Sequence, residues 1–585
     1  MTRVTGVLLA AGILLMLTVA ALPAQASQSI ADFGVTTSTT QAGGHPDLTS
    51  TFALDAPGQP ESAKNVIVDL PVGVFGNPQA ISTCRAVDFA QARCPIASQA
   101  GLVTVRANFG GDPNAVLGTA PLFNMEAQTA EETARFAVIV PGVNVPVTIP
   151  VAVRTAGDYG LRMTVSGITQ LIPLSYAGIT VWGFPADRVH DTERFGLGSP
   201  GSPPGCPGQG DTGCIQQQPR VAGIQVHPLT INPSTCTNQP LTVRLGVQTY
   251  QDPGTITRAE ASYPPTTGCE KATFNPVLNL NLTTEATDSP AGLDMQLNAP
   301  QFESFATSPS NIRSASVYLP EGLTINPDAA DGQTACTVEQ ANFDSEGPDD
   351  CPDNSKIGTF DIRTPALTGP LTGSLYFGEP QPGNQYRVFM VASGFGINAK
   401  LVAAVHPDPE TGQLTLSVVD LPQVPFAQFN LHLFASQRGL VATPTRCSVY
   451  VADSEFIPWN GSLAPQRSRP AISLTTGPNG GPCPGQIRPF HPSLEAGTPD
   501  PTAGAFSSFT LKLDRNDGDQ FLGDLNFRLP PGFTGSLRGL SYCPEAAIAA
   551  AAQNLGRAEQ ANPSCPASSQ VGTTNVAAGP GTHPF

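Results

Sequence analysis

The residues whose spacing most plainly implies chemistry are twelve cysteines. They form six neighbouring pairs along the chain, which suits either disulfides or thiolate ligands of zinc. A structural zinc site needs four ligands with C-x2-C-like spacing, and no C-x-x-C occurs in the sequence. Spacing does not fix connectivity, and nearest neighbours are the simplest scheme. We therefore predict six local disulfides in an oxidising compartment: Cys84 with Cys94, Cys206 with Cys214, Cys236 with Cys269, Cys336 with Cys351, Cys447 with Cys483, and Cys543 with Cys565.

Two acidic segments, DSEGPDDCPDN (344–354) and DRNDGD (514–519), could supply oxygen ligands for Ca²⁺. Neither has the spacing of an EF-hand loop, and a solvated loop is the simpler interpretation. We therefore predict no metal site. The carboxylates concerned are Asp344, Glu346, Asp349, Asp350, Asp353, Asp514, Asp517 and Asp519.

Recognisable catalytic motifs are missing from the sequence. The seven histidines form neither H-E-x-x-H nor H-x-x-x-H, and no G-x-S-x-G or P-loop occurs. We therefore predict a protein that is not an enzyme and has no cofactor. Trp182 and Trp459 end strand-like segments and could each stack on a sugar. A single tryptophan in such a place more often packs in a core or at an edge.

Three copies of one motif, C-P-x-x-S-x-[A/I/V]-G, begin at residues 94, 351 and 565. Each copy follows a strand-like segment that ends in L-P-x-G, at 70–73, 319–322 and 529–532. Between the two cysteines of each copy the sequence is typical of a short helix, which a disulfide across it would stabilise. The proline ends the helix, and the glycine suits a turn or a close backbone approach.

A second stretch also recurs. Residues 121–182 and 374–434 both contain alternating, β-branched segments with Gly/Pro turns, and both lead to P-[S/T]-x-C, at 233–236 and 444–447. The fold class that this pattern predicts is mainly β, with tandem immunoglobulin-like β-sandwich domains and short disulfide-pinned helical insertions. A β-barrel is the alternative.

Composition limits the partners. The formal net charge is −17, which argues against nucleic acid and anionic lipid because phosphate binding needs a basic surface. The chain contains 58 Gly and 59 Pro, which favour short strands and turns over long helices.

The N-terminus resembles a secretory signal: Arg3 precedes an apolar run (7–21), and Ala24-Gln25-Ala26 suits signal peptidase. We predict cleavage after Ala26 and no membrane span thereafter. The third repeat stops after its C-P-x-x-S-x-V-G, and we expect a fragment of a longer protein. The predicted organisation is a signal peptide (1–26), a helix-bearing disulfide subdomain (27–120) and a β-subdomain (121–285, with a Gly/Pro-rich insertion at 196–214) in repeat 1, a helix-bearing subdomain (286–370) and a β-subdomain (371–488) in repeat 2, and a partial repeat 3 (489–585).

With these motifs, and with AGAFSSFTLKL (503–513) as an A-G-x-F-S-x-F-x-L element, the chain resembles large secreted tandem-repeat proteins of high-GC Gram-positive bacteria. The resemblance covers most of residues 40–585. It implies export and tandem β-domains, and it carries over no activity and no catalytic residues.

These features predict a non-enzymatic, secreted or cell-surface structural or adhesive repeat protein. The first alternative is an array of modules that bind carbohydrate or cell-wall polymer. The second is an exported hydrolase of an unfamiliar type. Expected partners are a cell-wall polymer or other surface proteins, and the sequence identifies none of them.

Overall fold

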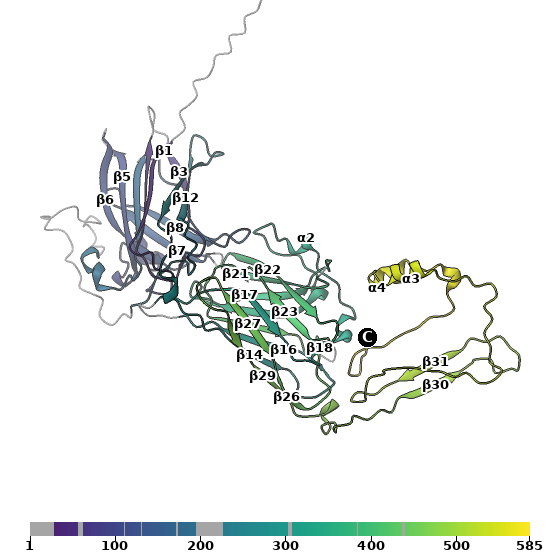
Figure 1. Cartoon of the computed structure of the whole chain (residues 1–585). Helices are drawn as coiled ribbons and strands as arrows, with labels where there is room; N and C mark the ends of the chain where they lie inside the picture. The colour runs from purple at the N-terminus through teal and green to yellow at the C-terminus, as the bar shows by residue number, and fades with distance from the viewer. Residues whose placement is uncertain are drawn as a thin grey trace, which may run out of the picture.

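A computed structural model describes residues 29–55, 62–109, 112–129, 132–170, 173–194, 226–301, 307–382, 384–435 and 439–585. The predicted signal peptide and the Gly/Pro-rich insertion lie outside these residues. Two sheet domains follow one another, and a C-terminal unit with little regular structure extends beyond them (Figure 1). Within the described part of the chain, no helix is long and apolar enough to cross a membrane.

The first domain is built on one antiparallel sheet of 11 strands, in the order β1-β2-β10-β5-β6-β7-β8-β9-β3-β12-β13. Its strands are β1 (Ser29–Thr37), β2 (Leu48–Asp55), β3 (Ala63–Asp69), β5 (Gln99–Phe109), β6 (Asp112–Met125), β7 (Ala134–Val140), β8 (Val145–Val153), β9 (Leu161–Ser166), β10 (Leu174–Val181), β12 (Leu241–Thr249) and β13 (Thr257–Tyr263).

The second domain is also one antiparallel sheet of 11 strands, in the order β14-β16-β24-β19-β20-β21-β22-β23-β17-β27-β28. If the strands of each sheet are numbered along the chain, both sheets run 1-2-9-4-5-6-7-8-3-10-11. The strands are β14 (Val277–Leu282), β16 (Leu293–Asn298), β17 (Ile312–Tyr318), β19 (Lys356–Arg363), β20 (Leu371–Phe377), β21 (Tyr386–Gly394), β22 (Ile397–Pro407), β23 (Leu414–Val418), β24 (Gln428–Leu433), β27 (Asp453–Pro458) and β28 (Gln466–Ser468).

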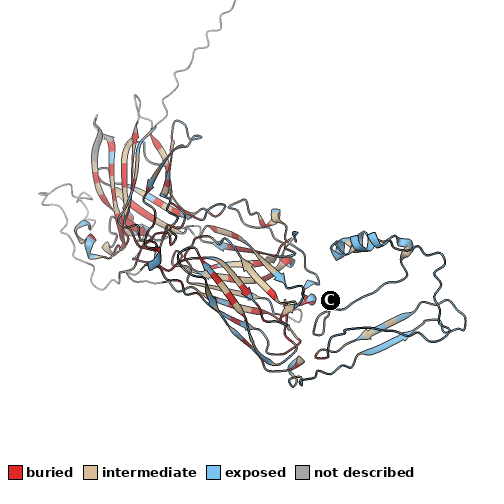
Figure 2. Cartoon of the chain, viewed as in Figure 1, coloured by how far each residue is buried: buried red, intermediate tan, exposed pale blue. Residues whose placement is uncertain are grey.

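Both sheets curl until their edges meet. In the first domain β1 lies against β13, and in the second β14 approaches β28. Apolar side chains gather between the curled faces, where Figure 2 shows buried residues along most strands. The prediction of mainly β tandem domains is confirmed, and each domain is a nearly closed sheet of sandwich or barrel type.

Shorter elements complete the domains. Small pairings join β4 (Phe75–Gly76) to β11 (Thr230–Ile231), β25 (Val441–Ala442) to both β15 (Pro290–Ala291) and β18 (Thr324–Ile325), and β26 (Ser448–Val451) to β29 (Ala471–Leu474). The short helices are α1 (Ala86–Ala90), η1 (Ile96–Ser98), η2 (Arg188–Glu193), η3 (Cys269–Lys271), η4 (Pro327–Ala330), α2 (Val338–Ala341), η5 (Asp353–Ser355) and η6 (Pro478–Gly480).

The two predicted parts of each repeat share one sheet. In repeat 1, β1, β2, β3 and β5 come from residues 27–120, and the later strands of the same sheet come from 121–285. Repeat 2 combines strands from 286–370 and 371–488 in the same way. The boundaries at 120 and 370 remain predictions, and hydrogen-bonded strands run on both sides of them.

Five of the six predicted cysteine pairs are joined in the structure: Cys84–Cys94, Cys236–Cys269, Cys336–Cys351, Cys447–Cys483 and Cys543–Cys565. The sixth predicted pair, Cys206 and Cys214, lies outside the described residues, so its disulfide stays a prediction. The predicted helical insertions are present, because α1, α2 and the C-terminal helices each lie between two bonded cysteines. Such loops limit the unfolded ensemble and so stabilise helices too short to persist alone.

The repeated motif has a local physical role in each copy. The serine hydroxyls of Ser98, Ser355 and Ser569 each donate to the carbonyl oxygen of the motif proline at 2.6 Å, closing a 3₁₀ turn. The glycine then lets two strands approach closely. A Cβ at Gly101 would overlap the carbonyl oxygen of Thr180 in β10, and a Cβ at Gly358 would overlap that of His432 in β24.

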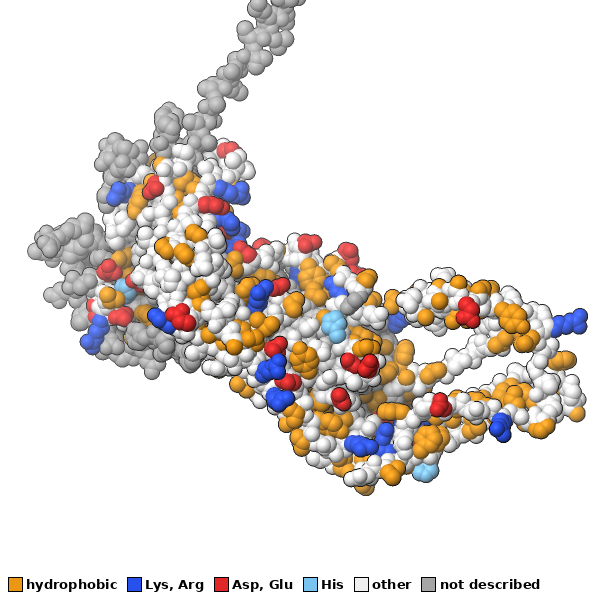
Figure 3. Space-filling model, viewed as in Figure 1, with side chains coloured by type: hydrophobic (Ala, Val, Ile, Leu, Met, Phe, Trp, Pro, Cys, Tyr) orange, Lys and Arg blue, Asp and Glu red, His pale blue; other side chains and the backbone are white. Residues whose placement is uncertain are grey.

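The C-terminal unit (489–585) has one strand pair. Its elements are β30 (Ser493–Gly497), β31 (Thr510–Asp514), α3 (Glu545–Ala551), α4 (Gly556–Ala561) and η7 (Ala567–Ser569). Hydrophobic side chains lie on its surface (Figure 3), and Phe506 is 98% exposed. Among the described residues, nothing lies within 4 Å of a Cβ built at Gly572, the motif glycine of this unit.

Candidate ligand-binding groove on the second domain

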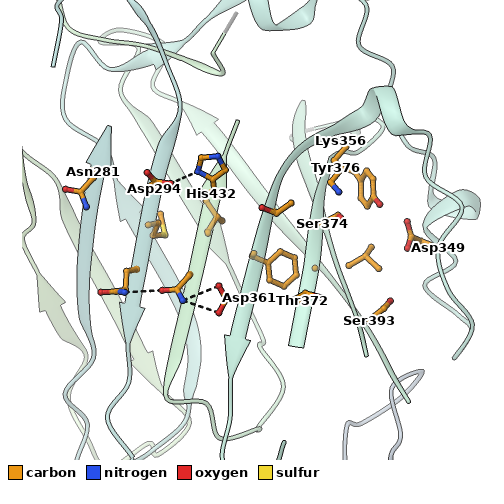
Figure 4. A pocket seen from close by; sticks show the side chains of 18 of the residues that line it. Asn281, Asp294, Asp349, Lys356, Asp361, Thr372, Ser374, Tyr376, Ser393 and His432 are labelled. Carbon is orange, nitrogen blue, oxygen red and sulfur yellow. Dashed lines mark hydrogen bonds and ion pairs between the residues drawn. The ribbon is translucent and has the colours of Figure 1, made fainter. Parts of the chain in front are cut away.

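The outer face of the second sheet carries polar side chains (Figure 4). They come from six neighbouring strands, β14, β16, β24, β19, β20 and β21. Paired residues of adjacent antiparallel strands face the same side of a sheet, so the register sorts these side chains into rows. One row is Asn281, Asp294, His432, Thr359 and Ser374, and the other is Asn279, Gln296, Asn430, Asp361, Thr372 and Ser393. The rows line a groove of about 820 Å³.

Strand alternation explains why these residues face outward. In β14 the sequence VLNLNL buries Leu278 and Leu280 and exposes Asn279 between them. Side chains of a strand point alternately to its two faces, so leucines at every second position fill the domain interior and leave the asparagines outside. β16 and β24 follow the same alternation.

Hydrogen bonds between neighbouring strands orient the groove. The Nδ1 atom of His432 lies 2.5 Å from Oδ1 of Asp294. The amide of Asn430 donates to both carboxylate oxygens of Asp361, at 3.1 and 3.2 Å, and Gln296 donates to Oδ1 of Asn430 at 3.2 Å. The side chains of Asp294 and His432 remain 49% and 47% exposed, so their free polar atoms can meet a ligand.

The loop after α2 forms one end of the groove, where Asp349, Lys356 and Tyr376 lie. Lys400 in β22 fixes the position of that loop through three hydrogen bonds. Its Nζ donates to the carbonyl oxygens of Asn342, Ser345 and Gly347 at 2.6, 2.9 and 2.6 Å. Burial raises the pKa of the Tyr376 hydroxyl and the charge of nearby Asp349 adds to the shift, so Tyr376 remains a neutral hydrogen-bond donor.

The equivalent face of the first domain is different. Thr49 and Thr180 occupy the register positions of Asp294 and His432, and their hydroxyls are 2.9 Å apart. Thr104 stands where the second domain has Asp361, and its hydroxyl lies 2.9 Å from that of Thr119. The same scaffold therefore carries short threonines that pair with each other in one domain and longer amide, carboxylate and imidazole groups in the other.

One row has the residue order of a catalytic triad, because Thr359 follows Asp294 and His432 across the sheet. A triad requires a nucleophile hydroxyl in hydrogen-bond reach of the imidazole. Among the described contacts, none joins His432 to a hydroxyl group. The arrangement fits hydrogen bonding to a polyhydroxylated molecule better than nucleophilic catalysis.

Both tryptophans considered from the sequence pack against the protein. Trp182 is 1% exposed and stacks on His190, with ring centroids 4.4 Å apart. The indole nitrogen of Trp459 donates to the carbonyl oxygen of Leu421 at 2.9 Å, and the guanidinium of Arg313 lies over its ring. Neither indole is placed as an open platform for a sugar.

The cysteines of the described residues form structural disulfides and do not line the groove. Every cysteine in the described part of the chain is disulfide-bonded, and none of these cysteines lines the groove. The prediction for Cys206 and Cys214 is not confirmed, because Cys206 and Cys214 both belong to the insertion outside the described residues.

The acidic segments take other roles. Asp349 lines the groove, Asp517 accepts from the amide of Gly581 at 3.0 Å, and Asp519 accepts from the amide of His491 at 3.2 Å. In the part of the chain that the structure describes, no three His, Cys, Asp or Glu side chains are grouped so as to hold a metal ion.

Sequence reasoning missed the groove because its residues come from strands far apart in the chain. A signal was present in the segments LNLN (278–281), DMQLN (294–298) and FNLHL (429–433), in which amide or charged residues alternate with apolar ones. Alternation predicts strands, but only the register shows that the three segments are neighbours.

Comparisons with known proteins add little. No family model and no curated protein matches the chain. Among solved structures, it is similar to the Enterococcus faecalis MSCRAMM ACE, described as binding its ligands by the collagen hug model, with 8% identity over 77% of this chain and 96% of that one and a TM-score of 0.16. It is also similar to the C-terminal domain of the Streptococcus agalactiae AgI/II polypeptide BspA, with 6% identity over 76% and 99% and a TM-score of 0.17.

A third similar structure is the N-terminal domain of the Streptococcus gordonii adhesin Sgo0707, with 9% identity, coverage of 73% of this chain and 60% of that one, and a TM-score of 0.15. These neighbours come from Gram-positive bacteria. Their TM-scores are so low that they carry no argument about the function of this chain.

Proposed function

We propose that the chain is an exported, non-enzymatic binding protein of the cell surface, and that its second domain holds a polyhydroxylated polymer in the polar groove. The ligand class is a glycan or another hydroxyl-rich cell-wall polymer. The observation that carries the proposal is the double row of amide, carboxylate, imidazole and hydroxyl groups on six neighbouring strands.

The chemistry of the rows suits such a ligand. Asn and Gln side chains both donate and accept, and carboxylates accept from hydroxyl groups, so neighbouring sugar hydroxyls would find complementary partners. Two parallel rows also suit an elongated ligand better than a compact one. The threonine pairs of the first domain satisfy each other and leave fewer free groups, which makes that face a natural internal control.

Export is supported by the N-terminal sequence and by the five disulfides, which persist in oxidising compartments. The tandem domains would then act as a scaffold that presents the groove outside the cell. The alternative of an exported hydrolase has no described nucleophile-to-histidine contact to support it.

The proposal is tested by retention of the purified protein on insoluble peptidoglycan and on cell-wall polysaccharide. The variant Asp361→Ala/Asn430→Ala removes both partners of one hydrogen-bonded pair. Gln296 loses its bond to Asn430, and its exposed amide can bond to water instead. We expect at least a tenfold loss of retention. The matched control is Thr104→Ala/Thr119→Ala on the first domain, which should retain the polymer as the unmodified protein does.

Circular dichroism of each variant shows whether the fold is kept. Failure of the unmodified protein to bind either polymer would contradict the proposed ligand class. Equal loss in the groove variant and the control variant would show that binding does not depend on this groove.

A further inference from the structure

The interior of the second domain contains an apolar cavity of about 310 Å³. It lies on the opposite side of the sheet from the polar groove. Its walls include inward-facing side chains of Leu297 in β16, Phe360 in β19, Met390 in β21, Leu401 in β22 and Phe429 in β24. An 11-stranded nearly closed sheet encloses more space than an eight-stranded barrel, whose side chains just fill it.

At one pair of equivalent positions in a central hairpin, the first domain has the larger side chains. Phe136 pairs with Ile149 in the β7–β8 hairpin, and both are buried in a single hydrophobic cluster. The same register positions of the β21–β22 hairpin hold Val388 and Ala403. The second domain has two large clusters of buried residues and a small one beside the Cys336–Cys351 disulfide, and the cavity is lined by members of both large clusters.

The lining specifies the chemistry of a ligand. Among the described residues around the cavity, none has a charged side chain, and the polar members are hydroxyl-bearing. A charged or strongly hydrated group would be desolvated there without a partner, whereas a hydrocarbon group would gain from leaving water. Natural ligand pockets begin at about this volume, and apolar cavities of even half this size bind small apolar molecules.

One end of the cavity reaches the junction with the first domain, where Phe75, Thr133, Val153 and Tyr159 join the lining. Hydrogen bonds fix this contact: Tyr159 donates its hydroxyl to the carbonyl oxygen of Lys400 at 3.2 Å, and Thr133 donates to that of Phe395 at 3.3 Å. The polar part of an amphipathic ligand would lie at this junction, and its hydrocarbon part would lie among the strands.

We propose that the second domain binds a single alkyl or acyl chain in this cavity. The site is distinct from the polar groove: none of the groove's polar residues lines the cavity, and the two linings share only the apolar residues Met295, Phe360 and Leu431. The hydrocarbon could come from a free fatty acid or from the acyl chain of a membrane lipid, and both share the same recognition inside the domain.

The test uses the neutral fluorophore N-phenyl-1-naphthylamine, whose emission rises in apolar surroundings, with the full chain after removal of copurified lipid. We expect saturable binding of the probe and its displacement by dodecanoate. Displacement by dodecanoate alone would assign the site to free fatty acids. Displacement also by vesicles of phosphatidylglycerol would assign it to lipid acyl chains.

The variant Ala403→Phe fills the cavity, and Val402→Phe places the same ring one residue away, on the outer face of β22 where Val402 is 37% exposed. We expect at least a tenfold weaker affinity for the probe in Ala403→Phe and no change in Val402→Phe. Ala399→Phe is a second filling variant, and thermal unfolding identifies any variant that does not fold.

Two results would overturn the proposal. One is no saturable binding of the probe by the unmodified protein. The other is unchanged affinity in a folded Ala403→Phe or Ala399→Phe variant, which would place the probe elsewhere. Neither result depends on retention of glycan, so failure of this site is distinguishable from failure of the groove.

Discussion

The two sheet domains have the same strand order. They differ in the side chains of their interiors and in the side chains on their outer faces. The first has one large hydrophobic cluster, a small cluster beside the Cys84–Cys94 disulfide, and an outer face with paired threonines. The second has a divided core around a cavity and an outer face of amides, carboxylates and an imidazole. The shared parts set the architecture: the disulfides, the L-P-x-G turns and the motif glycines. The proposed binding chemistry lies in side chains that alternate along the strands.

The prediction with the largest expected effect concerns two equivalent disulfides and asks whether they stabilise both domains equally. The Cys236–Cys269 and Cys447–Cys483 bonds close loops of 33 and 36 residues at equivalent places. Loop-closure entropy gives each about 4 kcal/mol. Replacing either pair by serines should therefore lower the free energy of unfolding of its own domain by a similar amount.

Hydrogen exchange measured by mass spectrometry assigns the loss to one domain or the other. Replacement of Cys543 and Cys565, in the largely exposed C-terminal unit, should leave both domains unaffected. A much larger decrease in the free energy of unfolding for one of the two replacements would show that the two equivalent disulfides do not stabilise their domains equally.

A second prediction concerns the motif glycine. In Gly101→Val and Gly358→Val the new side chain would meet the backbone of β10 or β24, which cannot move without breaking the sheet. Overpacking of this kind costs about 3 kcal/mol. The same change at Gly572 meets open space and should cost little. Chemical denaturation measures the free energy of unfolding of the three variants. Equal decreases in all three would mean that the glycine is not needed for the close approach of two strands.

The behaviour of Gly572 also explains what the sequence could and could not predict. The motif itself predicted the disulfide, the helix and the proline stop in all three copies, because those depend on neighbouring residues. The motif could not predict that a strand follows it in the two sheet domains, whereas no strand is described after it in the C-terminal unit. In both domains strand 4 pairs with strands 9 and 5, so it forms only where those later strands are present. Strands 1 and 2 pair with each other, and their counterparts in the C-terminal unit, β30 and β31, do form.

The groove was out of reach for the same reason. Local alternation assigned Asn279, Gln296 and Asn430 to outward positions, but their meeting depends on strand 9 lying between strands 2 and 4. A composition of few aromatics and two tryptophans pointed toward Trp182 and Trp459, which are used in packing. The cavity was equally hidden, because inward-facing positions are apolar in both domains, and an apolar pattern does not show how much of the interior the side chains fill.

A third prediction exchanges core residues between the domains. Ile149→Ala should destabilise the first domain by about 3 kcal/mol, because it opens a cavity in a continuous core. Ala403→Ile should stabilise the second domain by about 1 kcal/mol, because it adds buried methyl groups to space already present. Thermal unfolding with domain-resolved hydrogen exchange measures both. Destabilisation by Ala403→Ile would indicate that the second core is already filled at this position.

The smallest expected effect concerns how the C-terminal unit contacts the second domain. Burial raises the pKa of Asp517; the amide of Gly581 opposes this shift, the charges of Asp288 and Asp328 add to it, and Arg515 opposes it. A carboxyl group with a raised pKa in the docked state binds protons more tightly there than when undocked. Docking is therefore strengthened as the pH falls from above the raised pKa toward the ordinary value of an aspartate, and weakened as the pH rises through that window.

The effect should stay below about 1 kcal/mol because the group is only half buried. Hydrogen exchange of residues 578–585, corrected for the intrinsic pH dependence of exchange, should show greater protection at pH 4.5 than at pH 7. Asp517→Asn should remove that difference, and Asp524→Asn, an exposed site in the same unit, should preserve it. The unit also contacts the second domain through Asp328 and Asp288. A pH response that persists in Asp517→Asn would show that Asp517 is not its origin.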